Sequence, residues 1–328
     1  MTALKLAFIG YGRHAKLNLY PSIKILGYQL SSVATTREET AKQASLDYQI
    51  PNFYTNYQRL LSEQHPDAVF VCTQPDRYYE IVKNVLLSGS HVFVEKPLGM
   101  TLSEAKSIAD ISKSTGKNVM VGFMKRFAPA YIKIKEIIDS QEFGSSLGVT
   151  QFYTSRNFAK DAREYILFAA IHYVDLLKWY FGDVAQVTGS QLLKENTVLL
   201  SFTIKFVNGA VGSLQYCGAS TWEKASAEMT ITGENGYVRI DGIDKVSVYH
   251  KNTKINDPRW QLVEENEQTF GTMLTTSGGG MQALYLNGFV GEIKHFVESI
   301  EQGLSPQNSA ADNLKTMEFV DLLMKSLN

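Results

Sequence analysis

Short apolar runs alternate with amphipathic stretches through the first third of the chain. The runs are hydrophobic on both faces, as expected of parallel strands buried between helices. We predict strands at Leu4–Ile9, Tyr28–Thr35, Asn52–Tyr54, Ala68–Cys72, His91–Val94 and Asn118–Gly122. The intervening stretches predict helices at Ala15–Leu26, Glu38–Ser45, Asn56–Glu63, Asp76–Ser88 and Leu102–Ser114. This alternation predicts an α/β fold with a doubly wound parallel sheet of the Rossmann type in a first domain, residues 1–122.

The pattern changes after residue 122, where we place the second domain, residues 123–328. Helices are predicted at Ala130–Ser140 and Phe168–Phe181, and the tail Leu284–Leu327 is again helical. Between them, polar and apolar residues alternate as in an open, mostly antiparallel sheet with one face solvated or turned to a partner. Its strands are predicted at Gly148–Thr154, Val184–Leu192, Thr197–Phe206, Ala210–Tyr216, Ala227–Thr232, Tyr237–Asp241 and Lys245–His250.

Charge and cysteine usage exclude several classes of partner. The chain carries 32 Lys and Arg against 33 Asp and Glu, a net charge of −1. It therefore lacks the overall field that attracts nucleic acid or an anionic membrane. Cys72 and Cys217 have no metal-ligand spacing, and no histidine or acid cluster predicts a metal site. We find no signal peptide and no apolar run of roughly 18 residues, and we expect a cytoplasmic protein.

A glycine turn follows the first strand and opens the first helix. Residues 10–15 are Gly-Tyr-Gly-Arg-His-Ala, a GxGxxA pattern in the context that dinucleotide binding requires. Gly10 allows the tight turn, Gly12 allows close approach of a pyrophosphate, and Ala15 allows the helix to pack closely. We expect Gly10, Gly12, Arg13 and Ala15 to bind the cofactor. The alternative is a plain strand-to-helix turn that uses glycine.

The second strand ends without the acid that usually binds the ribose 2′-hydroxyl. Thr35, Thr36 and Arg37 stand there instead. Hydroxyl groups and a guanidinium can accept a 2′-phosphate, so these residues favour NADP over NAD. The alternative is that Thr36 is a helix N-cap, with Glu39 at capping-box spacing and Arg37 on the surface.

Residues 91–100, His-Val-Phe-Val-Glu-Lys-Pro-Leu-Gly-Met, end a strand on a charged pair before a proline. Ligands bind at the carboxyl ends of parallel strands. Lys96 there could exchange a proton with a substrate oxygen, since burial lowers the pKa of an amine. Pro97 restricts the backbone of Lys96 and orients it. The alternative is a surface ion pair, which contributes little.

Several motifs, in this order, resemble the Gfo/Idh/MocA family of NAD(P)-dependent oxidoreductases, which includes glucose–fructose oxidoreductase and inositol dehydrogenases. They are the glycine turn, Cys72–Pro75, Ser88–Leu98, Val121–Pro129, Ile231–Gly236, Gly288–Phe296 and Ala310–Asp312. The resemblance implies that Lys96 lies between nicotinamide and substrate, and that Thr73, Gln74, Pro75 and Glu95 lie at the cofactor. It also implies a last helix that returns to the first domain, and a homodimer or homotetramer formed through the second sheet.

The resemblance also assigns a proton relay to His172, with Asp175 one turn further along the predicted helix. A histidine suits this task because its pKa is near neutral. The alternative is a structural histidine satisfied by a carbonyl or by Asp175. The chain departs from the family at Phe168, where dehydrogenases often carry an acid, and at Tyr78, where many members have a histidine. These departures leave the sugar or inositol specificity open.

Five residues are candidate substrate contacts: Lys125, Arg126, Tyr153, Asn157 and Asp175. Lys125 and Arg126 follow the last predicted strand of the first domain, and an exposed basic pair is the alternative. Together these features predict an oxidoreductase that moves a hydride between nicotinamide and a hydroxyl or carbonyl carbon of a sugar, polyol or related small molecule. The alternatives are a cofactor-binding sensor without turnover, motivated by Phe168, and a reductase of an imine or tetrapyrrole-like bond.

Overall fold

A computed structural model describes residues 4–156, 159–250, 267–272 and 281–327. By its contacts the chain divides into two compact units. The first comprises Met1–Phe127 with Gly288–Glu318, and the second comprises Ala128–Asn287 with Phe319–Asn328. The domain boundary predicted at residue 122 stays a prediction. The first unit of the structure also includes Gly288–Glu318, from near the end of the chain.

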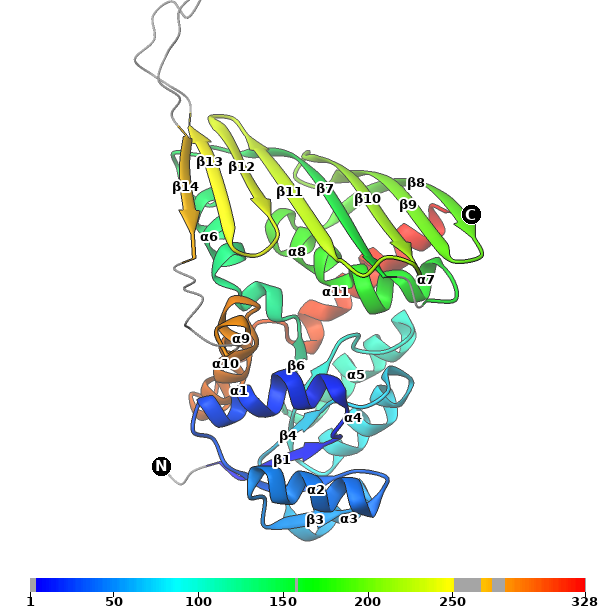
Figure 1. The fold of residues 1–328 in the computed structure, drawn as a ribbon, viewed down its shortest axis with the longest axis vertical. Helices are drawn as coiled ribbons and strands as arrows, with labels where there is room; N and C mark the ends of the chain where they lie inside the picture. The colour runs from blue at the N-terminus through cyan, green and yellow to red at the C-terminus, as the bar shows by residue number, and fades with distance from the viewer. Residues whose placement is uncertain (1–3, 157–158, 251–266, 273–280, 328) are drawn as a thin grey trace, which may run out of the picture. The chain divides into compact units, whose positions relative to one another are not determined.

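The first unit contains the predicted parallel sheet (Figure 1). Its order is β3-β2-β1-β4-β5-β6, with every neighbouring pair parallel. The strands are β1 (Leu6–Ile9), β2 (Leu30–Ala34), β3 (Asn52–Tyr54), β4 (Ala68–Val71), β5 (His91–Glu95) and β6 (Val119–Gly122). The central strands β1 and β4, and β6 at one edge, are buried at every position. This explains why their sequences are continuously apolar instead of alternating.

Helices connect these strands on both faces of the sheet. They are η1 (Ala15–Leu19), α1 (Tyr20–Ile25), α2 (Glu38–Tyr48), α3 (Tyr57–Gln64), η2 (Pro75–Arg77), α4 (Tyr78–Leu87), α5 (Leu102–Thr115) and η3 (Met124–Phe127). The single helix predicted at 15–26 begins instead as one π-helical turn, η1, before α1. Local signals explain α5, which starts at a capping box of Thr101 and Glu104 and ends at the left-handed Gly116.

Aromatic packing attaches the late segment to the first unit. The ring of Phe296 on α10 (Phe289–Glu301) lies 5.4 Å from Phe70 and 5.8 Å from Phe93, both on the sheet. Helix α10 also packs against α1 and η3. Because aromatic rings remove large apolar areas from water, this cluster provides the free energy that holds α10 on the sheet.

The second unit contains an eight-stranded sheet in the order β14-β13-β12-β11-β7-β10-β9-β8. Its strands are β7 (Ser146–Arg156), β8 (Val184–Lys194), β9 (Thr197–Phe206), β10 (Val211–Ala219), β11 (Ser226–Gly233), β12 (Gly236–Asp241), β13 (Lys245–His250) and β14 (Glu267–Gly271). Neighbours are antiparallel except β7 and β10, which are parallel. The mostly antiparallel prediction holds, and β14 is an additional strand that the sequence analysis missed.

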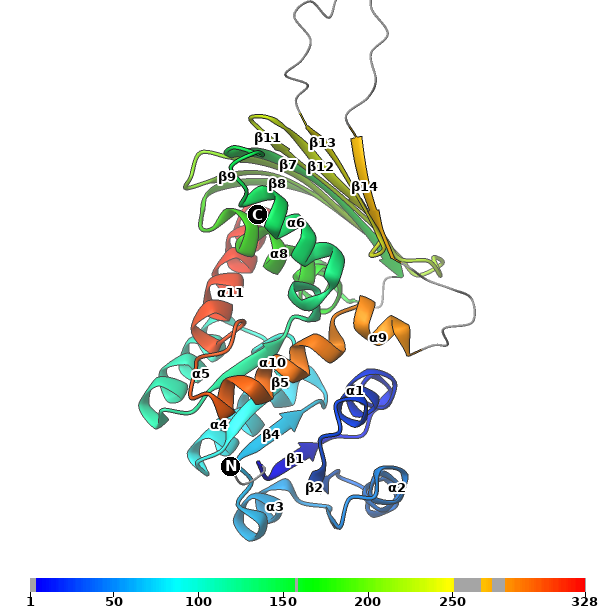
Figure 2. The same cartoon turned by 90° about the vertical axis from the view of Figure 1, so that its left-hand side faces the viewer.

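Helices α6 (Pro129–Ile138) and α8 (Ile171–Phe181) lie on one face of this sheet (Figure 2). The other helices of this part are α7 (Ala162–Tyr165), η4 (Ile166–Ala170), α9 (Gln282–Leu286) and the end of α11 (Ala310–Lys325). The helix predicted at Phe168 thus begins earlier, because the Asp161 side chain accepts a bond from the backbone N–H of Glu164 at 2.8 Å. No helix among the described residues is long and apolar enough to cross a bilayer.

Candidate active site

The glycine turn lies at the carboxyl end of β1, as predicted. Gly10 has a φ of +113°, and a Cβ placed there would approach the carbonyl oxygen of Cys72 to 2.0 Å. Only glycine fits both the conformation and the space. At Gly12, by contrast, a Cβ would meet no atom within 4 Å, so the backbone faces open space. Ala15 is fully buried and begins η1. This arrangement fits a dinucleotide, since a ligand can reach the Gly12 backbone at a helix start.

The residues after β2 do not form the N-cap at Thr36 that was considered as an alternative. Helix α2 is capped at Arg37, which has an extended backbone and makes no side-chain capping bond. The capping box of Thr36 and Glu39 is therefore wrong. Thr35 donates its hydroxyl to the carbonyl oxygen of Arg37 at 2.8 Å. Thr36 and Arg37 are exposed, so both side chains remain accessible to a cofactor.

The loop after β4 contains Thr73, Gln74 and Pro75, with Pro75 starting the short helix η2. Tyr78 is buried, and its hydroxyl donates to the carbonyl oxygen of Thr73 at 3.1 Å. Tyr78, which stands where many members of the family have a histidine, thus stabilises the backbone of this loop. Burial, with electrostatic interactions with Cys72 and Glu95 adding to it, raises the pKa of Tyr78 far above its ordinary value, so the hydroxyl stays protonated.

Lys96 follows β5 at the same edge of the sheet as the glycine turn. Burial lowers the pKa of its amine, while the charge of Glu95 acts in the opposite direction. The Glu95 side chain is buried, and one of its oxygens accepts the backbone N–H of Lys96 at 3.2 Å. The Lys96–Pro97 peptide is cis. A buried amine with a lowered pKa is suited to accept a proton.

Lys125 and Arg126 are both buried in η3, just beyond β6. Burial, and then repulsion from Lys96, lower the pKa of Lys125 to about 8. The exposed basic pair considered above is therefore wrong for these residues. Arg126 donates from Nη1 to a carboxylate oxygen of Asp312 on α11 at 2.6 Å. Lys125 thus lies within electrostatic range of Lys96, whereas Arg126 has a structural partner.

Two residues near Lys96 were not singled out by the sequence analysis as functional. His14 Nε2 lies 2.9 Å from a carboxylate oxygen of Glu95. Glu292 on α10 is fully buried, and neither of its carboxyl oxygens has a hydrogen-bond partner among the described residues. Burial, with the charge of Glu95 adding to it, raises the pKa of Glu292 well above its ordinary value. The sequence does carry a signal for this burial, because Glu292 lies three residues after Phe289 and four before Phe296, on the apolar face of the helix.

In the second unit, His172 and Asp175 are both buried on α8. The ring of Tyr153 on β7 lies against that of Tyr173 on α8, with ring centroids 4.6 Å apart and the planes tilted by 37°. The neighbouring Arg156 is exposed and donates from Nε to the carbonyl oxygen of Ser220 at 3.1 Å. Asn157 lies outside the described residues. The structure thus brings Tyr153 to the helix that carries His172.

Phe168 stands where the family often has an acid, and it lies within the π-helical turn η4. The phenylalanine is 38% exposed although it is apolar. Single π-helical turns inside α-helices occur often at functional sites. The segment that follows the predicted cofactor turn and the segment that precedes His172 each contain one, η1 and η4.

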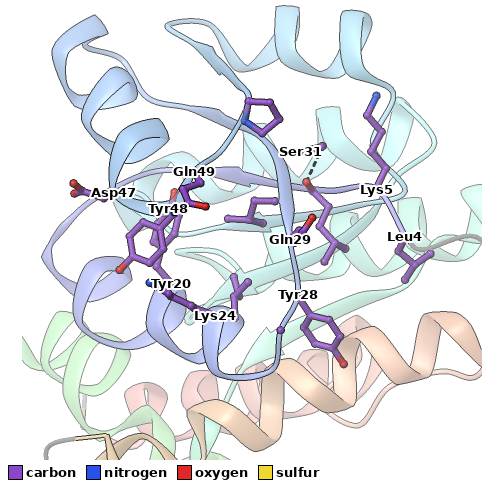
Figure 3. Close-up of a pocket in the computed structure, with 15 residues that line it drawn as sticks. Leu4, Lys5, Tyr20, Lys24, Tyr28, Gln29, Ser31, Asp47, Tyr48 and Gln49 are labelled. Atoms are coloured by element: carbon purple, nitrogen blue, oxygen red, sulfur yellow. Dashed lines mark hydrogen bonds between the residues drawn. The ribbon is translucent and has the colours of Figure 1, made fainter.

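A surface hollow of about 680 Å³ lies at the amino ends of β1 and β2 (Figure 3). Leu4, Tyr28 and Tyr48 are among its lining residues. It therefore lies at the opposite end of these strands from the glycine turn and Lys96. Among the described residues, no group of three or more histidine, cysteine or acidic side chains could hold a metal ion.

The sheet order, the glycine turn after β1 and the lysine after β5 together define a nicotinamide-dependent oxidoreductase of the Rossmann type. The chain belongs to the GFO_IDH_MocA family. Residues 4–123 match its N-terminal part, an oxidoreductase family NAD-binding Rossmann fold, and residues 166–328 match its C-terminal alpha/beta domain. The family resemblance inferred from the motifs is confirmed.

Individual relatives are distant but span the chain. The scyllo-inositol 2-dehydrogenase (NAD(+)) of Bacillus subtilis is 24% identical, over 92% of this chain and 88% of its own length. A dehydrogenase from Chromobacterium violaceum has a similar crystal structure, with a TM-score of 0.88, 19% identity and coverage of 100% and 96% of the two chains. A levoglucosan dehydrogenase in complex with NADH has a TM-score of 0.86 at 19% identity, over 99% and 97% of the chains. The structural likenesses support the same fold.

Proposed function

We propose that this oxidoreductase prefers NADP(H) and acts on a hydroxyl or carbonyl carbon of a sugar, polyol or related small molecule. The observation that carries the proposal is the buried Lys96 amine, whose pKa is lowered, on the strand edge that carries the glycine turn. The names of two relatives, an inositol dehydrogenase and a levoglucosan dehydrogenase, support the substrate class.

The residues divide the chemistry between them. The nicotinamide cofactor supplies the hydride acceptor or donor when it is bound. Gly10, Gly12, Arg13 and Ala15 at the turn would hold its pyrophosphate, and Thr73, Gln74 and Pro75 would contact its nicotinamide half. Lys96 as a neutral amine would take the hydroxyl proton of an alcohol substrate, or return it to a carbonyl oxygen as an ammonium.

Other side chains would orient the substrate. Lys125, with its pKa lowered to about 8, can donate to a substrate hydroxyl, and Tyr153 and Asp175 can bind further hydroxyl groups. Arg126 and Asn157 stay predicted substrate contacts, and Arg126 also binds Asp312. His172 as the proton-relay partner of Lys96 also stays a prediction, which a His172→Asn variant tests through loss of kcat.

Steady-state absorbance with NADP⁺ and a panel of polyols and sugars tests the proposal. A Lys96→Met variant is expected to bind cofactor normally and to lose about 10²- to 10⁴-fold in kcat, the usual contribution of a general base. Lys113→Met, at an exposed position of α5, is the matched control. Full turnover in Lys96→Met would refute the assignment.

The preference for NADP rests on the exposed Thr36 and Arg37 at the end of β2, where no acid stands. Removing one charged hydrogen bond costs about 1.5–3 kcal/mol. Arg37→Ala is therefore expected to lower kcat/KM for NADP⁺ by about 10- to 100-fold and to leave kcat/KM for NAD⁺ unchanged. Arg59→Ala, an exposed arginine paired with Glu63, is the control. Equal losses for both cofactors would refute Arg37 as a ligand of the 2′-phosphate.

A sensor without turnover is the second candidate, and the partly exposed Phe168 in place of an acid favours it. It predicts that calorimetry detects cofactor binding while no substrate on a broad panel oxidises NADPH or reduces NADP⁺. Turnover of any one substrate at an ordinary rate removes this candidate.

We also propose a homodimer or homotetramer formed through the second sheet. Its outward positions are exposed and rich in hydroxyl and amide groups, as at Thr203, Ser213 and Gln215. Gln215→Arg is expected to lower the mass measured by light scattering, whereas Gln58→Arg, on the exposed surface of α3, is not. An unchanged mass in both variants would contradict this interface.

A further inference from the structure

Three elements of the first unit bring ionisable side chains together around Glu95, the residue before Lys96. His14 comes from the glycine turn, Glu95 from the end of β5 and Glu292 from α10. His14 Nε2 lies 2.9 Å from the Glu95 carboxylate, and the His14 ring packs at 5.6 Å from Phe289, one turn before Glu292. The glutamates are buried, at 4% and 0% exposure, while the His14 side chain is 46% exposed.

The Glu95 carboxylate has a defined set of partners. One oxygen faces His14 Nε2, and the other accepts the backbone N–H of Lys96 at 3.2 Å. Its position is also fixed by space, because a Cβ at Gly122 would come within 3.2 Å of the Glu95 carboxyl carbon. Nδ1 of His14 lies 3.1 Å from the side-chain amide of Asn18, which orients the ring.

We propose that His14 is a positioning residue for the reaction, which holds the Glu95 carboxylate by its Nε2–H so that Lys96 can give up its proton. The inference rests on the proposed role of Lys96. By itself, a carboxylate beside an amine stabilises the ammonium form. A hydrogen bond from His14 engages that carboxylate, and a protonated His14 also repels the Lys96 ammonium.

The charges around the cluster agree with this role. Burial lowers the pKa of His14, and the charge of Lys96 lowers it further. The hydrogen bond and the charge of Glu95 act in the opposite direction and outweigh both, so the pKa of His14 is raised above its ordinary value. Because that repulsion is mutual, a charged His14 also favours the neutral Lys96 amine. Repulsion between Lys125 and Lys96 acts in the same direction.

The other ionisable groups near Glu95 add no charge. Burial, with Glu95 adding to it, raises the pKa of the Cys72 thiol, and Tyr78 is kept neutral in the same way. Glu292 has no hydrogen-bond partner among the described residues, and a buried carboxyl group without a partner is most stable as the neutral acid. Glu95 is therefore the charge that favours the ammonium form of Lys96, and His14 engages it.

The test is a pH titration of Lys96 by NMR in protein labelled at lysine ¹³Cε, with the resonance assigned by its loss in Lys96→Met. His14→Phe keeps a ring against Phe289 but removes the donor, and the Lys96 midpoint is expected to rise by about 1 pH unit. His14→Gln keeps an N–H donor, and its shift is expected to be smaller. A midpoint in His14→Phe that equals or falls below that of the wild type overturns the proposal. A shift in His14→Gln as large as in His14→Phe overturns the hydrogen bond as its cause.

Two further measurements complete the design. Glu292→Gln is expected to leave the Lys96 midpoint unchanged, because it replaces one neutral group by another; a fall would show that Glu292 carries charge. In Lys96→Met the imidazole midpoint of His14 is expected to rise, and this requires no substitution at His14. A His14 midpoint that does not move would overturn the coupling.

The titration midpoints of Lys96 and His14 separate the inference from the proposed function, because neither measurement needs a substrate. An inert protein with shifted midpoints would refute only the function. An active protein whose Lys96 midpoint ignores His14 would refute only the inference. Where a substrate is found, the acid limb of the pH profile of kcat/KM is expected to move upward in His14→Phe, with little change in the dissociation constant of the cofactor.

Discussion

Glu292 provides a direct test of the electrostatics of the first unit, through the substitution Glu292→Gln. The native carboxyl group is fully buried, and neither oxygen has a hydrogen-bond partner among the described residues. Burial and the nearby Glu95 charge raise its pKa well above that of an ordinary glutamate. The folded protein therefore keeps a proton at Glu292 that the unfolded chain has already released.

The sign and the size of the effect follow from proton linkage. Below the ordinary glutamate pKa of about 4.3 both states are protonated, and Glu292 makes no pH-dependent contribution. Above it, folding must take up one proton, so the stability that the neutral acid contributes is lost as pH rises towards the raised pKa. The loss is about 1.4 kcal/mol for each pH unit. Glutamine has no such proton, so the free energy of unfolding of Glu292→Gln is expected to rise relative to that of the wild type as the pH increases from 5.5 to 7.5.

Urea unfolding followed by far-ultraviolet circular dichroism at several pH values measures this difference. The constant cost of placing an amide at this buried position cancels, because only the slope against pH is compared. Glu298→Gln, on the same helix but with a side chain 43% exposed, controls for the loss of a carboxyl group from α10. If the difference in the free energy of unfolding between Glu292→Gln and the wild type does not change with pH over this range, Glu292 is not a neutral acid in the folded protein.

Three further predictions concern the fold and the site. Gly10→Ala is expected to lower the unfolding temperature strongly because its Cβ would collide with backbone, and an unchanged melting curve would contradict the glycine-turn geometry. Gly12→Ala is expected to fold normally and to weaken cofactor binding in a fluorescence titration, because its Cβ enters the open space; unchanged affinity would place the cofactor elsewhere. Asp312→Asn is expected to cost about 2 kcal/mol in chemical denaturation, since it removes the carboxylate that binds the buried Arg126; no loss would show that this ion pair is immaterial.

Much of the fold could be predicted because its signals are local. Continuous apolar runs marked the strands of the first sheet, and the bounds Asn52–Tyr54, Thr197–Phe206 and Lys245–His250 were predicted to the residue. Errors occurred where the backbone does not follow a simple repeat. The first helix contains a π-helical turn, and Arg37 instead of Thr36 caps α2. Such details depend on packing against neighbours, which a periodic pattern does not record.

In the candidate site, too, residues with local signals could be predicted, whereas their surroundings could not. Gly10, Gly12 and Lys96 could be named from the sequence alone, because turn chemistry and the position of a charge at a strand end are local features. The roles of these residues in binding and catalysis stay predictions, as do those of His172 and the substrate contacts. What the structure adds is their surroundings, above all the buried position of Lys125 and the bond that ties Arg126 to Asp312.

By itself, the sequence determined the class of this protein: the order of its strands and helices, the cofactor turn and the lysine after the fifth strand. Only the tertiary structure decided the electrostatic state of that lysine. His14 and Glu95 are 81 residues apart along the chain and meet at 2.9 Å, and Glu292 reaches the same region from a helix near the end of the chain. Burial and charge act through space, so the pKa of a side chain is a property of its neighbours in the folded protein and not of its place in the sequence.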